Sequence, residues 1–173
     1  MSNDYFPNFP LAYHITFSCY GGWLHGDPAG SVDRHLFNCV GAPLLPPSPK
    51  RVEFELQELK NPPYELDPPR RKSVMEAIRE VCDYRGWVLL AAHVRRYHVH
   101  IVVRANANPE KVMNDFKAYS SRRLNREGFD PAGCKRWERH GSTKYKWTQD
   151  DVESAVGYVL YKQGEPMEIF QLT

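Results

Sequence analysis

Two histidines separated by one residue are the most chemically informative feature of the sequence. His98 and His100 lie in the run Tyr-His-Val-His-Ile-Val-Val over residues 97–103. Because side chains alternate along a β-strand, the two imidazoles share one face, while Val99, Ile101 and Val103 share the other. Imidazoles are common ligands of divalent cations. The spacing therefore predicts half of a metal site on a sheet, with two surface histidines on a solvated strand as the plainer alternative.

A tyrosine in the next helix-like segment supplies a second reactive group. Tyr119 precedes Ser-Ser-Arg-Arg, and Arg122, Arg123 and Arg126 follow at three, four and seven residues, on neighbouring positions of a helical surface. Tyr119 falls at the edge of the apolar stripe, where packing holds the ring and leaves the hydroxyl accessible. A metal, a tyrosine and arginines together suit phosphodiester cleavage. A tyrosine at the rim of an ordinary core is the alternative.

Charge is unevenly distributed along the chain. The 173 residues carry a formal net charge of only +2, so the overall balance does not argue for nucleic acid. Residues 111–146, however, hold ten basic and four acidic residues, a local charge of +6. A local positive surface is what a phosphate backbone requires. The segment therefore favours nucleic-acid binding over a solvated face of mixed charge.

The cysteines and the apolar runs restrict where the protein works. The four cysteines are widely spaced, which disfavours a zinc ribbon, a redox motif or a disulfide framework. No secretory signal pattern and no apolar run of membrane-spanning length is present. We therefore expect a reduced, cytoplasmic protein that does not associate with a membrane.

The periodicity of apolar residues predicts an α+β fold. Alternation indicates strands, and apolar residues three and four apart indicate helices. We expect one domain over residues 1–173, with an irregular, proline-rich insertion at 21–69 that holds a short helix or strand at 50–60. The order of strand, insertion, helix, hairpin, helix, strand and helix indicates an antiparallel sheet. The expected strands are 11–20, 87–94, 98–104 and 142–147, and the expected helices are 70–86, 109–126 and 149–162.

Together these segments resemble a known family. His-Val-His over 98–100 matches the histidine-hydrophobic-histidine (HUH) motif, and Lys-Ala-Tyr-Ser-Ser-Arg-Arg-Leu over 117–124 looks like the nucleophile helix of single-tyrosine HUH transposases. These are the transposases of the smallest bacterial insertion sequences and the related REP-associated tyrosine transposases. The similarity extends to residues 12–17 and 141–147 and leaves 21–69 largely uncovered. It implies a ferredoxin-like (RRM-like) antiparallel sheet flanked by helices, with a long irregular insertion after the first strand.

The resemblance also implies an activity and partners. In such enzymes Mg²⁺ or Mn²⁺ on His98 and His100 would polarise the scissile phosphate of single-stranded DNA. Tyr119 would attack phosphorus, giving a 5′-phosphotyrosine link and a free 3′-hydroxyl that can later rejoin. Family members work on DNA hairpins as dimers. The expected partners are therefore single-stranded or hairpin DNA and a second copy of the chain.

The sequence departs from the family's pattern at the third metal ligand. That ligand is usually Gln or Asn, one helical turn after the tyrosine, but Arg123 stands there and cannot bind a cation. Asp115 or His140 is the favoured substitute, and His93 is a further candidate. If none of them ligates, the protein is a degenerate or domesticated relative that binds structured single-stranded DNA or RNA without cutting it. A hydrolase of small phosphorylated substrates would leave the tyrosine and the basic helix without a role.

Other side chains are expected to hold the nucleic acid. Basic side chains contact phosphates, and aromatic rings stack on unpaired bases. The expected phosphate contacts are Arg95, Arg96, Arg122, Arg123, Arg126 and Lys146, and the expected stacking residues are Tyr145, Trp147 and Trp137.

Overall fold

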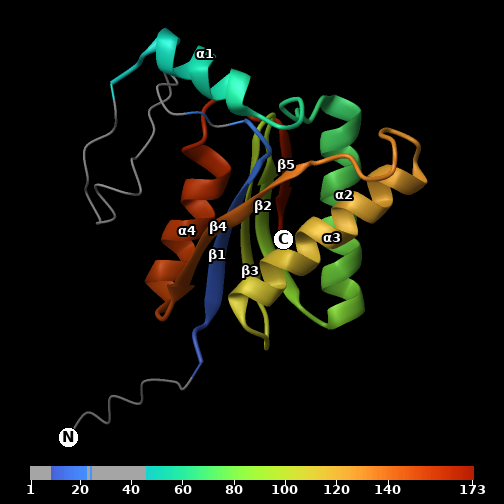
Figure 1. Cartoon of the computed structure of the whole chain (residues 1–173). Helices are drawn as coiled ribbons and strands as arrows, with labels where there is room; N and C mark the ends of the chain where they lie inside the picture. The colour runs from blue at the N-terminus through green and yellow to red at the C-terminus, as the bar shows by residue number, and fades with distance from the viewer. Residues whose placement is uncertain (1–8, 23, 25–45) are drawn as a thin grey trace, which may run out of the picture.

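The architecture is an antiparallel sheet with helices on both faces (Figure 1). The computed structural model describes residues 9–22, 24 and 46–173. In chain order the elements are β1 (Ala12–Cys19), α1 (Pro49–Glu58), α2 (Pro68–Arg85), β2 (Val88–Val94), β3 (His98–Arg104), α3 (Pro109–Arg126), β4 (Trp137–Lys146), α4 (Gln149–Tyr161) and β5 (Glu168–Gln171).

The sheet has the strand order β4-β1-β3-β2-β5, and every neighbouring pair is antiparallel. Its first four strands, with α2 and α3 as the crossovers, follow the β-α-β-β-α-β pattern of ferredoxin-like folds. The expected fold class is thereby confirmed. The central strand β3 places His100 opposite Thr16 of β1 and His93 of β2. The histidine motif therefore lies in the middle of the sheet.

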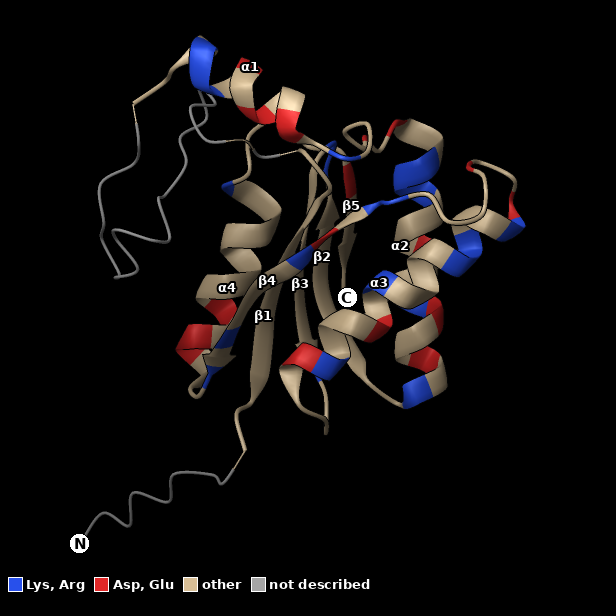
Figure 2. Ribbon diagram, viewed as in Figure 1, with Lys and Arg blue, Asp and Glu red and all other residues tan. Residues whose placement is uncertain are grey.

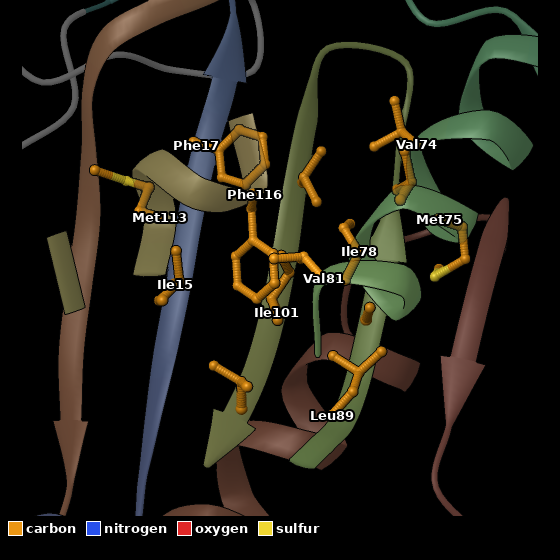
Figure 3. Close-up of a cluster of buried hydrophobic side chains, with 14 of the residues drawn as sticks. Ile15, Phe17, Val74, Met75, Ile78, Val81, Leu89, Ile101, Met113 and Phe116 are labelled. Atoms are coloured by element: carbon orange, nitrogen blue, oxygen red, sulfur yellow. The ribbon is translucent and has the colours of Figure 1, made fainter. Parts of the chain in front are cut away.

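Helices α2 and α3 cover one face of the sheet and bury the larger hydrophobic core (Figures 1 and 3). Ile15 and Phe17 of β1 and Ile101 of β3 point into this core, where Ile78 of α2 and Phe116 of α3 meet them. These strand residues alternate with the polar ones, so the apolar side of β1 and β3 determines which face the two helices must cover.

Helix α4 lies on the opposite face of the sheet (Figure 1). It packs Val152, Ala155 and Val159 against small or branched side chains of the sheet, Ala91 and Val102 among them. This second core is smaller than the first, and the polar strand residues, including the histidines, lie beside it. The helix begins at a capping box: Thr148 accepts from the Asp151 backbone N–H, and the Asp151 carboxylate accepts from the Thr148 N–H.

Several sequence expectations for the elements are confirmed. Gly86 ends α2 in the left-handed region at φ 68°, as a residue without a Cβ favours. The helix begins at residue 68, two residues earlier than expected, and Asp67, which the sequence reasoning did not select, caps it by accepting from the Arg70 N–H. Helix α3 runs over 109–126 as expected. Among the described residues, no helix is both long enough and apolar enough to cross a membrane.

The insertion and the last strands differ from the expectation. Residues 23 and 25–45 of the expected irregular stretch lie outside the described part, while residues 49–58 form a helix rather than a strand. Tyr64 and Leu66, expected to be irregular, are buried in the main core, and their N–H groups donate to the Tyr20 and Arg96 carbonyls. Strand β4 begins five residues earlier than expected, and β5 was missed because its short, half-exposed sequence carries little alternation.

Candidate active site

The HUH histidines lie side by side on the α4 face of the sheet. The ring centroids of His98 and His100 are 4.9 Å apart at an interplanar angle of 88°. His100 is buried, and its Nδ1 forms a 3.0 Å hydrogen bond with Thr16 Oγ1 on the neighbouring strand. When Nδ1 carries the proton and donates it to Thr16, the lone pair of Nε2 is available to a cation, an arrangement common behind metal-bound histidines.

The electrostatics of the site keep these imidazoles neutral. Burial, with Arg95 and His93 nearby, lowers the pKa of His98 from 6.5 to about 4. Burial and the adjacent His98 lower the pKa of His100 to about 3. A neutral imidazole is the form that a metal requires, so both histidines are in that form at neutral pH.

His14 adds a third imidazole that the sequence reasoning missed. Its ring centroid is 5.7 Å from that of His100, and its Nε2 is buried without a hydrogen-bond partner among the described residues. Burial and the nearby Lys146 and Lys144 lower its pKa to about 4. The alternation of β1 could have identified His14, because His14, Thr16 and Ser18 share one face of that strand. This face lies beside His98 and His100 once β1 pairs with β3.

A tyrosine of α4, and not of α3, faces the histidines. The Tyr158 ring centroid is 6.0 Å from that of His100 and 5.7 Å from that of His14, with near edge-on geometry to both. Tyr158 remains 43% exposed, so a ligand can reach it from solvent. It lies 60 residues after the motif in sequence, but α4 folds back onto the sheet and brings it to the histidines.

The expected placement of Tyr119 is wrong. Tyr119 lies on α3 and packs against the core on the opposite side of the sheet, next to Tyr84 and under the Arg122 guanidinium, which is 4.4 Å from its ring centroid. The physical reason is the alternation of β3. The apolar stripe of α3 must cover Val99 and Ile101, and the histidines point the other way.

The substitutes expected for the third ligand do not join the pair. Asp115 lies on α3 and pairs with Lys111 at 2.8 Å and Arg85 at 3.2 Å. Both ring nitrogens of His93 are engaged: Nδ1 donates to the Val159 carbonyl, and Nε2 accepts from the Met167 N–H, each at 3.1 Å.

His140 is exposed on β4. Over the described residues, no three His, Cys, Asp or Glu side chains are arranged to hold a metal ion, so neither Asp115 nor His140 completes the set.

Of the basic residues predicted to contact phosphate, the structure brings Arg95 and Lys146 near the histidines. The positive charge of Arg95 contributes to the low pKa of His98, and that of Lys146 to the low pKa of His14. Lys144, which the sequence reasoning did not select, pairs in register with His14. These cations come from two sides of the site, on β2–β3 and on β4.

The other predicted phosphate contacts lie elsewhere (Figure 2). Arg122 and Arg126 belong to α3, across the sheet from the histidines. Arg123 makes ion pairs with three carboxylates of α2 and α3, those of Glu76, Glu80 and Glu127. Arg96 pairs with Glu65. The high positive charge of residues 111–146 is therefore neutralised in part by α2, which a linear charge count cannot show.

The three aromatic residues expected to stack on bases divide into two groups. The Trp137 ring is packed against Phe17 and Tyr64 of the main core, and its Nε1–H donates to the Lys117 carbonyl, so it serves the fold. Tyr145 and Trp147 are partly exposed at the end of β4.

The fold and the histidine–tyrosine arrangement define a protein of the single-tyrosine HUH type. The family model for IS200-like transposases matches residues 65–155, more than half of the 173-residue chain, and the chain belongs to this family. A search of curated proteins finds no match.

Two solved structures are similar to this chain at low sequence identity, and the first of them has the same fold. A REP-associated tyrosine transposase bound to a REP hairpin is 11% identical, with 94% of this chain and 71% of that chain covered at a TM-score of 0.51. A candidate transposase from Deinococcus radiodurans R1 is 13% identical, with 94% and 98% covered at a TM-score of 0.46.

Proposed function

We propose that this transposase-family protein nicks and rejoins single-stranded DNA, with Tyr158 as the nucleophile beside His98 and His100. The observation that carries the proposal is the position of Tyr158. It is the tyrosine whose ring contacts His100 on the polar face of the sheet, and it is open to solvent. Tyr119 is separated from the same histidines by the sheet itself.

The donor set of the site fits a divalent cation. His98 and His100 supply two neutral imidazoles. Gln163 follows Tyr158 by five residues, and its Nε2 donates to the Tyr158 carbonyl at 3.2 Å, which holds the amide at the C-terminal end of α4. We propose these three as the ligands of Mg²⁺ or Mn²⁺. Such an ion polarises a phosphate oxygen and offsets its negative charge during attack.

The chain's own residues account for the remaining chemistry. The Tyr158 oxygen forms a bond to phosphorus as the bond from phosphorus to the 3′-oxygen breaks. The tyrosine proton passes to solvent, and the 3′-oxygen takes up a proton to become a hydroxyl. The product is a 5′-phosphotyrosine ester, which keeps the energy of the phosphodiester for rejoining. Arg95, Lys144 and Lys146 lie around the site and would neutralise the DNA backbone on either side of the scissile phosphate.

We propose hairpin-containing single-stranded DNA as the substrate. The REP-associated tyrosine transposase with the same fold is bound to a REP hairpin. We also propose that the protein acts as a homodimer, which multi-angle light scattering of the protein with and without DNA tests directly.

The decisive experiment compares two tyrosines in one assay. End-labelled hairpin-bearing single-stranded DNA is incubated with Mn²⁺ and the wild-type protein, Tyr158→Phe or Tyr119→Phe, and a denaturing gel reports the covalent adduct. We expect an adduct with wild type and Tyr119→Phe and none with Tyr158→Phe. An adduct that persists in Tyr158→Phe and disappears in Tyr119→Phe would overturn the assignment.

A non-cutting DNA- or RNA-binding protein is the second candidate. It is favoured by one observation: within the described residues, no group of three His, Cys, Asp or Glu side chains is arranged to hold a metal ion. The absence of an adduct with any member of a broad pool of oligonucleotides, together with retained binding, would select this candidate over the enzyme.

A further inference from the structure

A second candidate site lies at the end of the sheet where β1 begins and β4 ends. A cavity of about 330 Å³ opens there between the two strands and the loop that leads into α3. Its walls include the rings of Phe9, Tyr13, Tyr145 and Trp147, with Asn106 and Asn108 beside them. Tyr13 belongs to the face of β1 covered by α3, so the cavity and the histidines lie on opposite faces of the sheet.

The aromatic rings of this cavity are arranged as a stacking platform. The rings of Tyr145 and Trp147 are nearly parallel, at 11°, with centroids 6.0 Å apart. Tyr13 meets Tyr145 edge-on at 5.3 Å and holds it in place. Tyr145 and Trp147 nevertheless remain 46% and 42% exposed, and Phe9 is 76% exposed. Large aromatic surface that the core does not bury, gathered in one hollow, is typical of a ligand site.

The surroundings of the cavity favour a nucleic-acid ligand. Lys144 and Lys146 alternate with Tyr145 and Trp147 along β4, so the lysines lie on the histidine face of the sheet while the aromatic rings line the cavity on the other face. Side-chain amides can both donate to and accept from the edges of bases. Exposed aromatic rings are a usual means of stacking unpaired bases without a strict sequence requirement, and the lysines of the same strand would hold the backbone where it crosses to the histidine face.

We propose that this cavity holds an unpaired nucleobase of single-stranded DNA, stacked on Tyr145 and Trp147. The inference rests on the proposed function and deepens it. The same DNA would be held at two places, with its scissile phosphate at the histidines and a base outside the cleavage site in the cavity. The cavity would then contribute to DNA affinity and to the position of the scissile phosphate at the histidines, and it would take no part in bond cleavage.

The test separates base stacking from backbone binding. Fluorescence anisotropy measures the affinity of wild type, Trp147→Ala and Tyr145→Ala for a labelled oligothymidine of about ten nucleotides, within the site sizes of single-strand-binding proteins. Each substitution is expected to weaken binding by about 5- to 150-fold, as loss of one stacked base does. Tyr84→Ala, at a more exposed tyrosine on α2 outside both sites, is the control and should bind as wild type does.

A second oligonucleotide makes the result independent of folding. An abasic strand of the same length keeps the phosphates and removes the bases. Wild type should bind it about as weakly as Trp147→Ala binds oligothymidine, and Trp147→Ala should lose little further affinity. Equal binding of the two strands by wild type, or unchanged affinity for oligothymidine in both aromatic variants, would overturn the inference.

The outcome is distinguishable from a failure of the proposed enzyme. Binding is measured without a divalent metal, and adduct formation at Tyr158 is scored separately. Loss of base-dependent binding in Trp147→Ala without any wild-type adduct would leave the cavity in place and refute the cutting activity. A wild-type adduct together with unchanged oligothymidine affinity in Trp147→Ala and Tyr145→Ala would support the cutting activity and refute base binding in the cavity.

Discussion

His93 connects the sheet to the part of the chain that positions Tyr158, and its replacement should reveal that connection. The side chain is fully buried, at 0% exposure, on β2, which lies between β3 and β5 in the sheet. Its Nδ1–H donates to the carbonyl of Val159, the residue after Tyr158, and its Nε2 accepts from the N–H of Met167, which leads into β5. One neutral imidazole thus joins the sheet to α4 and to the loop between α4 and β5.

The cost of removing His93 follows from these two bonds. His93→Leu keeps the volume approximately and leaves a buried carbonyl and a partly buried N–H without partners. An unsatisfied buried group costs about 1–3 kcal/mol and the partly buried N–H costs less, so the free energy of unfolding should fall by about 2–5 kcal/mol. For a domain of this size the melting temperature should fall by roughly 4–20 °C.

Urea unfolding followed by circular dichroism measures this effect. His93→Gln, whose amide can still donate and accept, should recover part of the loss. His140→Leu, at an exposed histidine of β4, is the control and should change stability by less than about 0.5 kcal/mol. If His93→Leu were as stable as wild type to within about 0.5 kcal/mol, the reasoning from the two buried hydrogen bonds would be refuted.

Three further predictions concern acid, a helix cap and metal. Because burial lowers the folded-state pKa of His14 to about 4 and that of His100 to about 3, the unfolded chain binds protons first as pH falls below about 6.5. Stability, complete above that pH, should then fall by about 1.4 kcal/mol per pH unit for each such histidine, and urea titrations that stay flat down to about pH 4.5 would contradict this. Thr148→Ala removes the capping box of α4 and should cost about 1 kcal/mol in thermal melts, whereas an unchanged melting temperature would show that the cap is dispensable. Mn²⁺ at about 100 times its dissociation constant should raise the free energy of unfolding of wild type by about 2.7 kcal/mol and leave that of the double variant His98→Ala, His100→Ala unchanged. An equal increase in both proteins would exclude this metal site.

The sequence determined the sheet and the face on which the motif histidines lie. Alternation in β3 was enough to put His98 and His100 on one side and Val99 and Ile101 on the other. The expected ranges also located the end of α2 and the start of α4, where Gly86 and Thr148 are the caps. These features depend on local geometry, the period of a strand and the unsatisfied N–H and C=O groups of helix ends, so a short stretch of sequence is sufficient to predict them.

The tyrosine proposed as the nucleophile could have been located by one further step from the same pattern. The helix that follows β3 must bury its apolar stripe on the apolar side of that strand, which removes Tyr119 from the histidines. The partner must therefore come from an element on the polar face. Only the tertiary structure shows that this element is α4 and that Tyr158 is the residue it presents to His100.

Tertiary structure also decided which charges and polar groups act together. Arg123 belongs to a predicted basic surface in the sequence, yet three carboxylates from α2 and α3 surround it. His14 lies 86 residues before His100 and becomes its neighbour through the pairing of β1 with β3. Periodicity specifies the direction in which a side chain points from its own element. What it meets there depends on the packing of segments far apart in the chain, because burial and electrostatic pairing are set by distance in space.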